Sequence, residues 1–320
     1  MKLPLLILSF IFLIGCNQKR STNVEVSVNS TLISETSLIV LGTVQDAGSP
    51  HIACKKECCE PLFKNPDPLR KVVSLGVIDS QNNKSFLFEA TPDITTQLKF
   101  LKQFSGSEKE IPDGIFLTHA HIGHYTGLMY LGKEATNTSK VPVYTMPKMK
   151  TFLEENGPWS QLVTTENIAL QAMENQKEIL LTPNLTVIPF LVPHRDEFSE
   201  TVGYKIIGPN KSALFIPDID KWEKWEVSII DAIKKVDYAF LDATFYDGVE
   251  LGNRDISEIP HPFIIESMKL FESLPLSEKQ KIHFIHFNHT NPALNLESDA
   301  YKTIINNGFK VAQTNDVIKL

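Results

Sequence analysis

Short apolar, β-branched runs alternate with helical stretches along most of the chain, and this alternation limits the folds open to it. Strand-like runs include SLIVLGT (37–43), GIFLT (114–118) and IHFIHF (282–287). Helical patterns occur near 93–104 and 147–155, among other places. About eleven strands interspersed with helices predict an α/β layered domain.

The domain is expected to cover residues 37–320, because no linker or internal repeat interrupts that range. A hydrophobic content of 42% with 22% charged residues is ordinary for a folded protein. The net charge of −7 argues against a general nucleic-acid-binding surface, which is normally basic. This charge does not exclude a small-molecule substrate, such as a small phosphorylated compound held by a metal, and that is the partner we expect.

The first residues form a separate segment. An apolar run from Leu3 to Gly15 is shorter than the roughly 20 residues of a membrane-spanning helix and has the composition of a signal peptide. LIGC, ending at Cys16, resembles the bacterial lipobox, whose Cys is lipidated. We therefore expect a signal peptide over 1–15, lipidation at Cys16 and a flexible tether over 16–36. The domain would then be an exported lipoprotein, anchored to a membrane and facing the periplasm or the cell surface.

Three of the four cysteines, Cys54, Cys58 and Cys59, lie together in HIACKKECCE. An odd number of thiols fits a metal site, one disulfide with a spare thiol, or three inert thiols. His51, three residues before Cys54, favours a structural zinc site made by His51 and the three cysteines.

The stretch LTHAHIGHYTGL (117–128) places His119, His121 and His124 within six positions, directly after a predicted strand. Neutral imidazoles at this spacing suit a transition metal. His194, Asp218 and His286 also lie at or near the ends of predicted strands. Their shared position predicts that they converge on one site.

These residues, in this order, resemble the metallo-β-lactamase superfamily, whose first motif is HxHxDH after a strand. The resemblance covers residues 37–320 and implies a four-layer αββα sandwich. It also implies one or two divalent cations, zinc with iron or manganese as alternatives. The ligands that it implies are His119, His121, His124, His194, Asp218 and His286.

Within the superfamily, the chain looks like the branch of the pyrroloquinoline-quinone (PQQ) biosynthesis B protein. The shared features are the early cysteines, EATPDI (89–94), HYTGL (124–128), VPVYTMP (141–147) and NHTNP (288–292). In that family the cysteine loop holds a structural zinc, which supports the same assignment here.

LDATF (241–245) is similar to HEATF of the tRNA 3′-processing and related phosphodiesterase branches. The match implies that Asp242 orients His261, which would protonate the leaving group, while Asp218 orients the water and the metal. The alternative is that Asp242 caps a strand and His261 is a loop residue.

Gly123 departs from the motif, which has an acidic ligand of the second metal at this position. The second site would keep His124, Asp218 and His286 and lose one anionic ligand, with His289 as a candidate substitute.

The first hypothesis is a hydrolase whose metal-activated water attacks a phosphodiester, a lactone or a similar bond. One alternative is an iron-dependent hydroxylase role like that ascribed to the PQQ-synthesis B family. The other is a non-catalytic metal-binding lipoprotein.

Overall fold

The computed structural model describes residues 32–195, 197–252 and 255–320. The predicted signal peptide, Cys16 and the tether up to residue 31 lie outside the described residues. Residues 32–36 contact the domain: the Ile33 N–H donates to the Phe104 carbonyl at 3.1 Å, and the Leu320 N–H donates to the Thr36 carbonyl at 2.9 Å. In these described ranges, no helix has both the length and the apolar character needed to cross a membrane.

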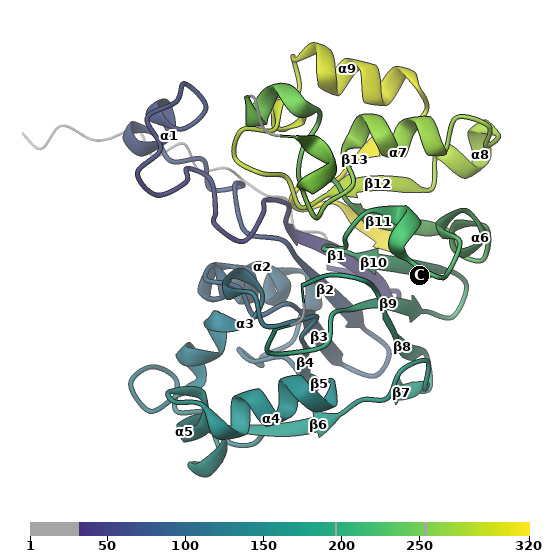
Figure 1. Ribbon diagram of the computed structural model, residues 1–320. Coiled ribbons are helices and arrows are strands. Elements are labelled where there is room, and N and C mark those ends of the chain that lie inside the picture. The colour runs from purple at the N-terminus through teal and green to yellow at the C-terminus, as the bar shows by residue number, and fades with distance from the viewer. Residues whose placement is uncertain (1–31, 196, 253–254) are drawn as a thin grey trace, which may run out of the picture. The chain divides into compact units, whose positions relative to one another are not determined.

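Two seven-stranded sheets form the centre of the domain in the described part of the chain (Figure 1). The first sheet consists, in spatial order, of β14 (Val317–Lys319), β1 (Ser37–Gly42), β2 (Ser74–Asp79), β3 (Lys84–Phe88), β4 (Gly114–Phe116), β5 (Val141–Thr145) and β6 (Ile168–Ala172). The second consists of β13 (Lys310–Val311), β12 (Ile282–Ile285), β11 (Tyr238–Asp242), β10 (Ser212–Ile216), β9 (Val202–Ile207), β8 (Leu185–Leu191) and β7 (Ile179–Thr182).

Helices flank the two sheets (Figure 1). On the side of the first sheet lie α2 (Ile94–Ser105), α3 (Ile122–Tyr125), α4 (Pro147–Glu155) and α5 (Trp159–Thr164). On the side of the second lie α6 (Ile229–Lys234), α7 (Ile264–Leu270), α8 (Leu276–Lys279) and α9 (Asp299–Asn306). The short α1 (Glu60–Lys64) follows the cysteine loop. The 3-10 turns are Thr126–Leu131, Trp222–Lys224, Gly248–Leu251, Ile256–Glu258 and Pro292–Leu294.

The packing of β1 shows why four layers form. Leu38 and Val40 point into the core between the sheets, while Ile39 and Leu41 pack in the core under the helices of the first sheet. Successive side chains of a strand point to opposite faces, so a strand that is apolar at every position needs a layer on each side. The second sheet has its own core against the helices of its outer face. The predicted αββα sandwich is confirmed.

The structure differs from the sequence prediction mainly at weakly patterned segments. The sequence did not identify β6, β7 or the two-residue β13 as strands. β6 and β7 are edge strands whose exposed positions break the apolar run (IALQA, ILLT). Between β10 and β11, Trp222–Lys224 form a 3-10 turn, and the separate α6 begins after the Ser228 N-cap.

Candidate metal centre

The strands deliver the predicted ligands to one place. His119 and His121 follow β4, and His124 lies in α3. His194 follows β8, Asp218 follows β10 and His286 follows β12. These loops start from buried strands, so their side chains are held by a rigid base.

The first group of ligand atoms comes from His119, His121, His194 and Asp218, and these atoms all lie within 4.8 Å of one another. Asp218 is central: its carboxylate oxygens lie 3.3 Å from His119 Nε2, 3.8 Å from His121 Nδ1 and 3.2 Å from His194 Nε2. Neighbouring ligands of a tetrahedral zinc with bonds near 2.1 Å are about 3.4 Å apart. The group has the dimensions of a single cation site.

The second group is formed by Asp46, His124 and His286, again within 4.8 Å. His286 Nε2 lies 4.0 Å from Asp46 Oδ1, and His124 Nε2 lies 3.8 Å from Asp218 Oδ2. Asp218 therefore lies between the two groups, as a bridging carboxylate would. Asp46 was not predicted from the sequence.

The groups have the donors of a metal site, and several of their buried ligand atoms have no hydrogen-bond partner within the described structure. The buried atoms His119 Nε2, His194 Nε2, His286 Nε2 and Asp218 Oδ1 accept or donate no hydrogen bond there. A buried polar atom without a partner is costly, and such atoms rarely converge. Imidazole nitrogens with carboxylate oxygens are the donor set of zinc, iron and manganese sites. The residues fit a divalent cation.

The outer nitrogens of the histidines are held by further polar groups. Thr118 Oγ1 lies 2.8 Å from His119 Nδ1, and Thr244 Oγ1 lies 2.8 Å from His286 Nδ1. Glu89 Oε2, fully buried, lies 3.3 Å from His124 Nδ1. Partners of this kind orient metal-binding imidazoles. Glu89 and His286 have positive φ angles of 77° and 69°, an uncommon conformation that is concentrated at functional sites.

The charge states suit cation binding. Burial and the neighbouring His124 hold the pKa of His119 well below its usual value, so His119 is a neutral donor. Burial opposes ionisation of Asp218, but His194 and His261 outweigh it and hold the pKa of Asp218 well below its usual range. Burial lowers the pKa of His124, yet Glu89, Asp46 and Asp218 raise it to about 9, so a cation at this position displaces a proton.

His261 lies beside the two groups and is paired with Asp242. Its Nδ1 is 2.9 Å from Asp242 Oδ2 and 3.2 Å from Asp218 Oδ1. The structure therefore contains the contact between Asp242 and His261 that the sequence predicted. The side chain of His261 is 15% exposed. Because Nδ1 faces carboxylates, Nε2 is the atom that can give a proton to a substrate. Burial lowers the pKa of His261, but Asp242 and Asp218 raise it to about 9.

Arg195, also absent from the sequence prediction, stands at the rim of the first group. Its Nη2 lies 3.1 Å from His121 Nε2, on the nitrogen opposite the one that faces Asp218. The side chain is exposed, so its positive charge faces solvent beside His121.

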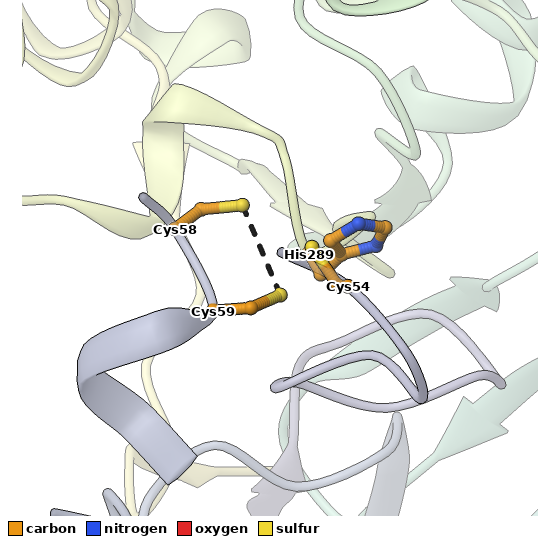
Figure 2. Close-up of side chains that lie close together, drawn as sticks. All are labelled: Cys54, Cys58, Cys59 and His289. Atoms are coloured by element: carbon orange, nitrogen blue, oxygen red, sulfur yellow. Dashed lines mark hydrogen bonds between the residues drawn. The ribbon is translucent and has the colours of Figure 1, made fainter. Parts of the chain in front are cut away.

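A separate group is formed by Cys54, Cys58, Cys59 and His289, whose ligand atoms lie within 4.8 Å of one another (Figure 2). The three cysteines are free thiols, and Cys58 Sγ lies 3.9 Å from Cys59 Sγ. A disulfide needs about 2.05 Å, whereas thiolates on one tetrahedral zinc with bonds near 2.3 Å are about 3.8 Å apart. The geometry fits a Cys₃His zinc site.

His289, not His51, is the imidazole of this group, which corrects the predicted ligand set. His51 Nδ1 lies 2.8 Å from the Ile52 carbonyl, and its ring packs on His289 with centroids 4.6 Å apart. Burial, with smaller contributions from His51 and Lys56, lowers the pKa of His289 to about 4, so it is a neutral donor. The same position means that His289 does not substitute for the missing ligand beside His286.

Some of these residues carried a signal in the sequence. Asp46 lies four residues after the buried strand β1, much as the predicted ligands follow their own strands. Glu89 directly follows β3 in EATPDI, a segment singled out only as a family resemblance. The local pattern did not mark His289 as a ligand of the cysteine group. His51 lies three residues before Cys54, whereas His289 is far from the cysteines in the sequence and lies three residues after His286.

A protein-family model described as a beta-lactamase superfamily domain matches residues 84–287. The coenzyme PQQ synthesis protein B of Methylococcus capsulatus is 23% identical over 303 residues, which cover 85% of this chain and 96% of that protein. The protein of the same name from Nitrosococcus oceani is 25% identical over 292 residues, which cover 81% and 92%.

Solved structures show the same fold. Zn²⁺-bound PqqB from Methylobacterium extorquens has a TM-score of 0.73 at 21% identity and covers 89% of this chain and all of its own. A diphosphatase of the PhnP family has a TM-score of 0.63 at 22% identity, with 89% and 97% covered. Human short-form tRNase Z has a TM-score of 0.52 at 14% identity, with 88% and 98% covered.

Proposed function

The chain belongs to the beta-lactamase superfamily and to its PqqB-like branch, and from this premise we propose that it is a metal-dependent hydrolase of an ester-type bond in a small substrate. The resemblance expected from the sequence motifs is thereby confirmed for the family and the fold. The substrate class and the roles of individual residues remain the proposal.

The observation that supports it best is the meeting of His119, His121 and His194 around Asp218, where the buried atoms His119 Nε2, His194 Nε2 and Asp218 Oδ1 have no hydrogen-bond partner in the described structure. These residues would hold a divalent cation, which would lower the pKa of a coordinated water from about 15.7 to near 7 and so supply a nucleophile at neutral pH. Asp218, ionised and central, orients the histidines and the cation.

Two neighbouring residues, Arg195 and His261, have the positions and charges to bind the substrate and to protonate the leaving group. Arg195 presents a guanidinium that can bind an anionic group of the substrate, such as a phosphate oxygen. His261, held by Asp242, gives a proton from Nε2 to the departing oxygen. The diphosphatase of the PhnP family among the structural neighbours supports a phosphorus-containing ester as the first substrate to try.

Two other functions are less well supported. A non-catalytic protein with a decayed second site does not explain why Asp46, His124 and His286 converge. An iron-dependent hydroxylase of the kind ascribed to the PQQ-synthesis B family would act on a peptide precursor, and assembly of a cofactor from a peptide is expected in the cytoplasm. The proposed export of this chain would separate it from such a substrate. The three-histidine first group with a water-activating cation instead favours hydrolysis.

The proposal includes location and a structural metal. We propose that Cys16 carries a lipid anchor and that the domain acts outside the cytoplasm. We also propose that Cys54, Cys58, Cys59 and His289 hold a zinc ion, which would tie the cysteine loop to the segment after β12.

Metal analysis combined with a substrate panel tests the hydrolase. The full chain, purified in mild detergent, should retain at least one divalent cation per chain in addition to the cysteine-bound ion. It should cleave one or more members of a panel of phosphodiesters, diphosphates and lactones, and lose that activity after chelation. Activity that survives complete removal of the metal, or iron-dependent oxygen uptake without any hydrolysis, would contradict the proposal.

His261→Gln tests the proton donor. We expect kcat to fall by about 10²–10⁴-fold for an alkyl leaving group and much less for p-nitrophenolate, which departs without a proton. The protonated ring is the active form, and Asp242 and Asp218, against the effect of burial, raise its pKa to about 9. The wild-type rate should therefore fall as the pH rises towards 9, at a lower pH when a cation is bound, because a nearby positive charge opposes protonation.

The pH–rate profile separates this role from a structural one. The variant should lose the alkaline limb and keep the acidic limb, which reports the activated water. An unchanged alkaline limb in His261→Gln would show that another group supplies the proton.

A further inference from the structure

We infer that Asp46 supplies the carboxylate that the HxHxDH motif lacks at Gly123, and that position 123 is a glycine because Asp46 occupies the space of its side chain. The inference rests on the proposed binding of cations by the histidine groups, and it does not depend on the substrate. It replaces the expectation that the second site is short of one anionic ligand.

Asp46 fills the space that a side chain at position 123 would need. A Cβ added to Gly123 would lie 1.8 Å from the Asp46 Cβ and 2.2 Å from the Asp46 Cα. Asp46 thus starts its side chain almost where a residue at 123 would start one. A carboxylate attached at either backbone reaches the same region, next to His124.

The Asp46 carboxylate also lies within reach of a cation shared with two histidines. Asp46 is one of three residues, with His124 and His286, whose ligand atoms lie within 4.8 Å of one another. With Asp218, whose Oδ2 lies 3.8 Å from His124 Nε2, the second site would offer two imidazoles and two carboxylates. Cation affinity rises with the number of anionic ligands, so Asp46 restores what Gly123 removes.

The backbone holds Asp46 against the His286 segment. The Gln45 N–H donates to the Phe287 carbonyl at 2.8 Å, and the Phe287 N–H donates to the Thr43 carbonyl at 2.8 Å. The Gln45 side-chain amide also donates to Asp46 Oδ1. Asp46 is only 20% exposed, so it is a positioned carboxylate and not a solvated surface acid.

Three variants of the full chain test the inference: Asp46→Asn, Gly123→Ala and the exchange D46G/G123D. The probe is Co²⁺, added to metal-free protein, with stoichiometry from elemental analysis and binding from calorimetry and visible spectra. The thiolate-to-cobalt charge-transfer band reports the cysteine site separately from the histidine sites. No substrate is needed for any of these measurements.

We expect Asp46→Asn to bind the second histidine-site Co²⁺ at least tenfold more weakly than wild type, while the first Co²⁺ is unchanged. Gly123→Ala removes no ligand, yet it should weaken the same ion, because its methyl group forces the Asp46 backbone to move. The exchange D46G/G123D should bring the second ion back to within about threefold of wild-type affinity. Asp231→Asn, an exposed carboxylate on α6 that pairs with Lys234, is the matched control and should bind like wild type.

The outcomes separate this inference from the proposed function. Wild-type affinity for the second ion in Asp46→Asn would overturn the inference and leave the first site, with its hydrolytic role, standing. An exchange variant that is folded, as shown by an unchanged cysteine-site band and melting temperature, but lacks the second ion would also overturn it. A wild-type protein that binds no Co²⁺ outside the cysteine site would refute both.

Discussion

Replacing Asp218 by Ala is expected to remove cations from both histidine groups and to lower kcat/KM by at least about 10³-fold, which corresponds to about 4 kcal/mol of transition-state stabilisation. Asp218 contacts His119, His121, His124 and His194 with one carboxylate and is 2% exposed. Its loss removes the shared anion and leaves four imidazoles facing one another. Metal content and kcat/KM of the purified variant measure the effect.

Asp79→Asn is the matched control for this experiment. Asp79 is likewise a fully buried Asp at the end of a strand, β2, but its partners are Asn82 and Thr182, away from the histidines. The Asp79→Asn substitution should lower the free energy of unfolding without changing the metal content or kcat/KM. If Asp218→Ala kept wild-type metal content and activity, the histidine groups would not be the reactive centre.

Replacing Cys59 by Ser is expected to lower the melting temperature by about 5–10 °C, because a bound ion at a concentration well above its dissociation constant adds about 3 kcal/mol or more to the free energy of unfolding. Cys59 is fully buried, and burial raises the pKa of its thiol to about 12 in the absence of metal. A Ser at this position would be a poor ligand for zinc and a buried hydroxyl. Differential scanning calorimetry and zinc content per chain test the prediction.

The cysteine site should also affect the second histidine site. The cysteine loop follows Asp46 by a few residues, and His289 follows His286 by three. A metal held by Cys54, Cys58, Cys59 and His289 therefore crosslinks the two segments that carry Asp46 and His286. We expect Cys59→Ser to weaken the second active-site ion as well as the structural ion.

Paired histidine variants distinguish the two ligand assignments. His289→Ala should lose the structural ion, while His51→Ala, which removes only the ring that packs on His289, should keep it. Zinc retained in His289→Ala and lost in His51→Ala would restore the assignment made from the sequence. A melting temperature lowered by reductant and unaffected by chelator would instead indicate a disulfide.

Local sequence patterns were sufficient to predict the layered fold and most of the candidate metal ligands of this protein. The alternation of apolar strands with helices predicted the α/β layers, since burial on both faces requires continuous apolar runs. The grouping of His119, His121 and His124 after β4 needed no tertiary information, because residues within six positions of one another are close in any fold. His194, Asp218 and His286 were recognisable as polar residues that follow buried strands.

The remaining assignments depended on contacts between segments that are far apart along the chain. Which carboxylate fills the space beside Gly123, and which histidine faces the cysteines, follow from the packing of the loop after β1 against the segment after β12. Sequence spacing says nothing about such packing, because the pairing of distant loops is set by how the two sheets bury their shared core. For that reason Asp46 and His289 became visible only once the chain was folded.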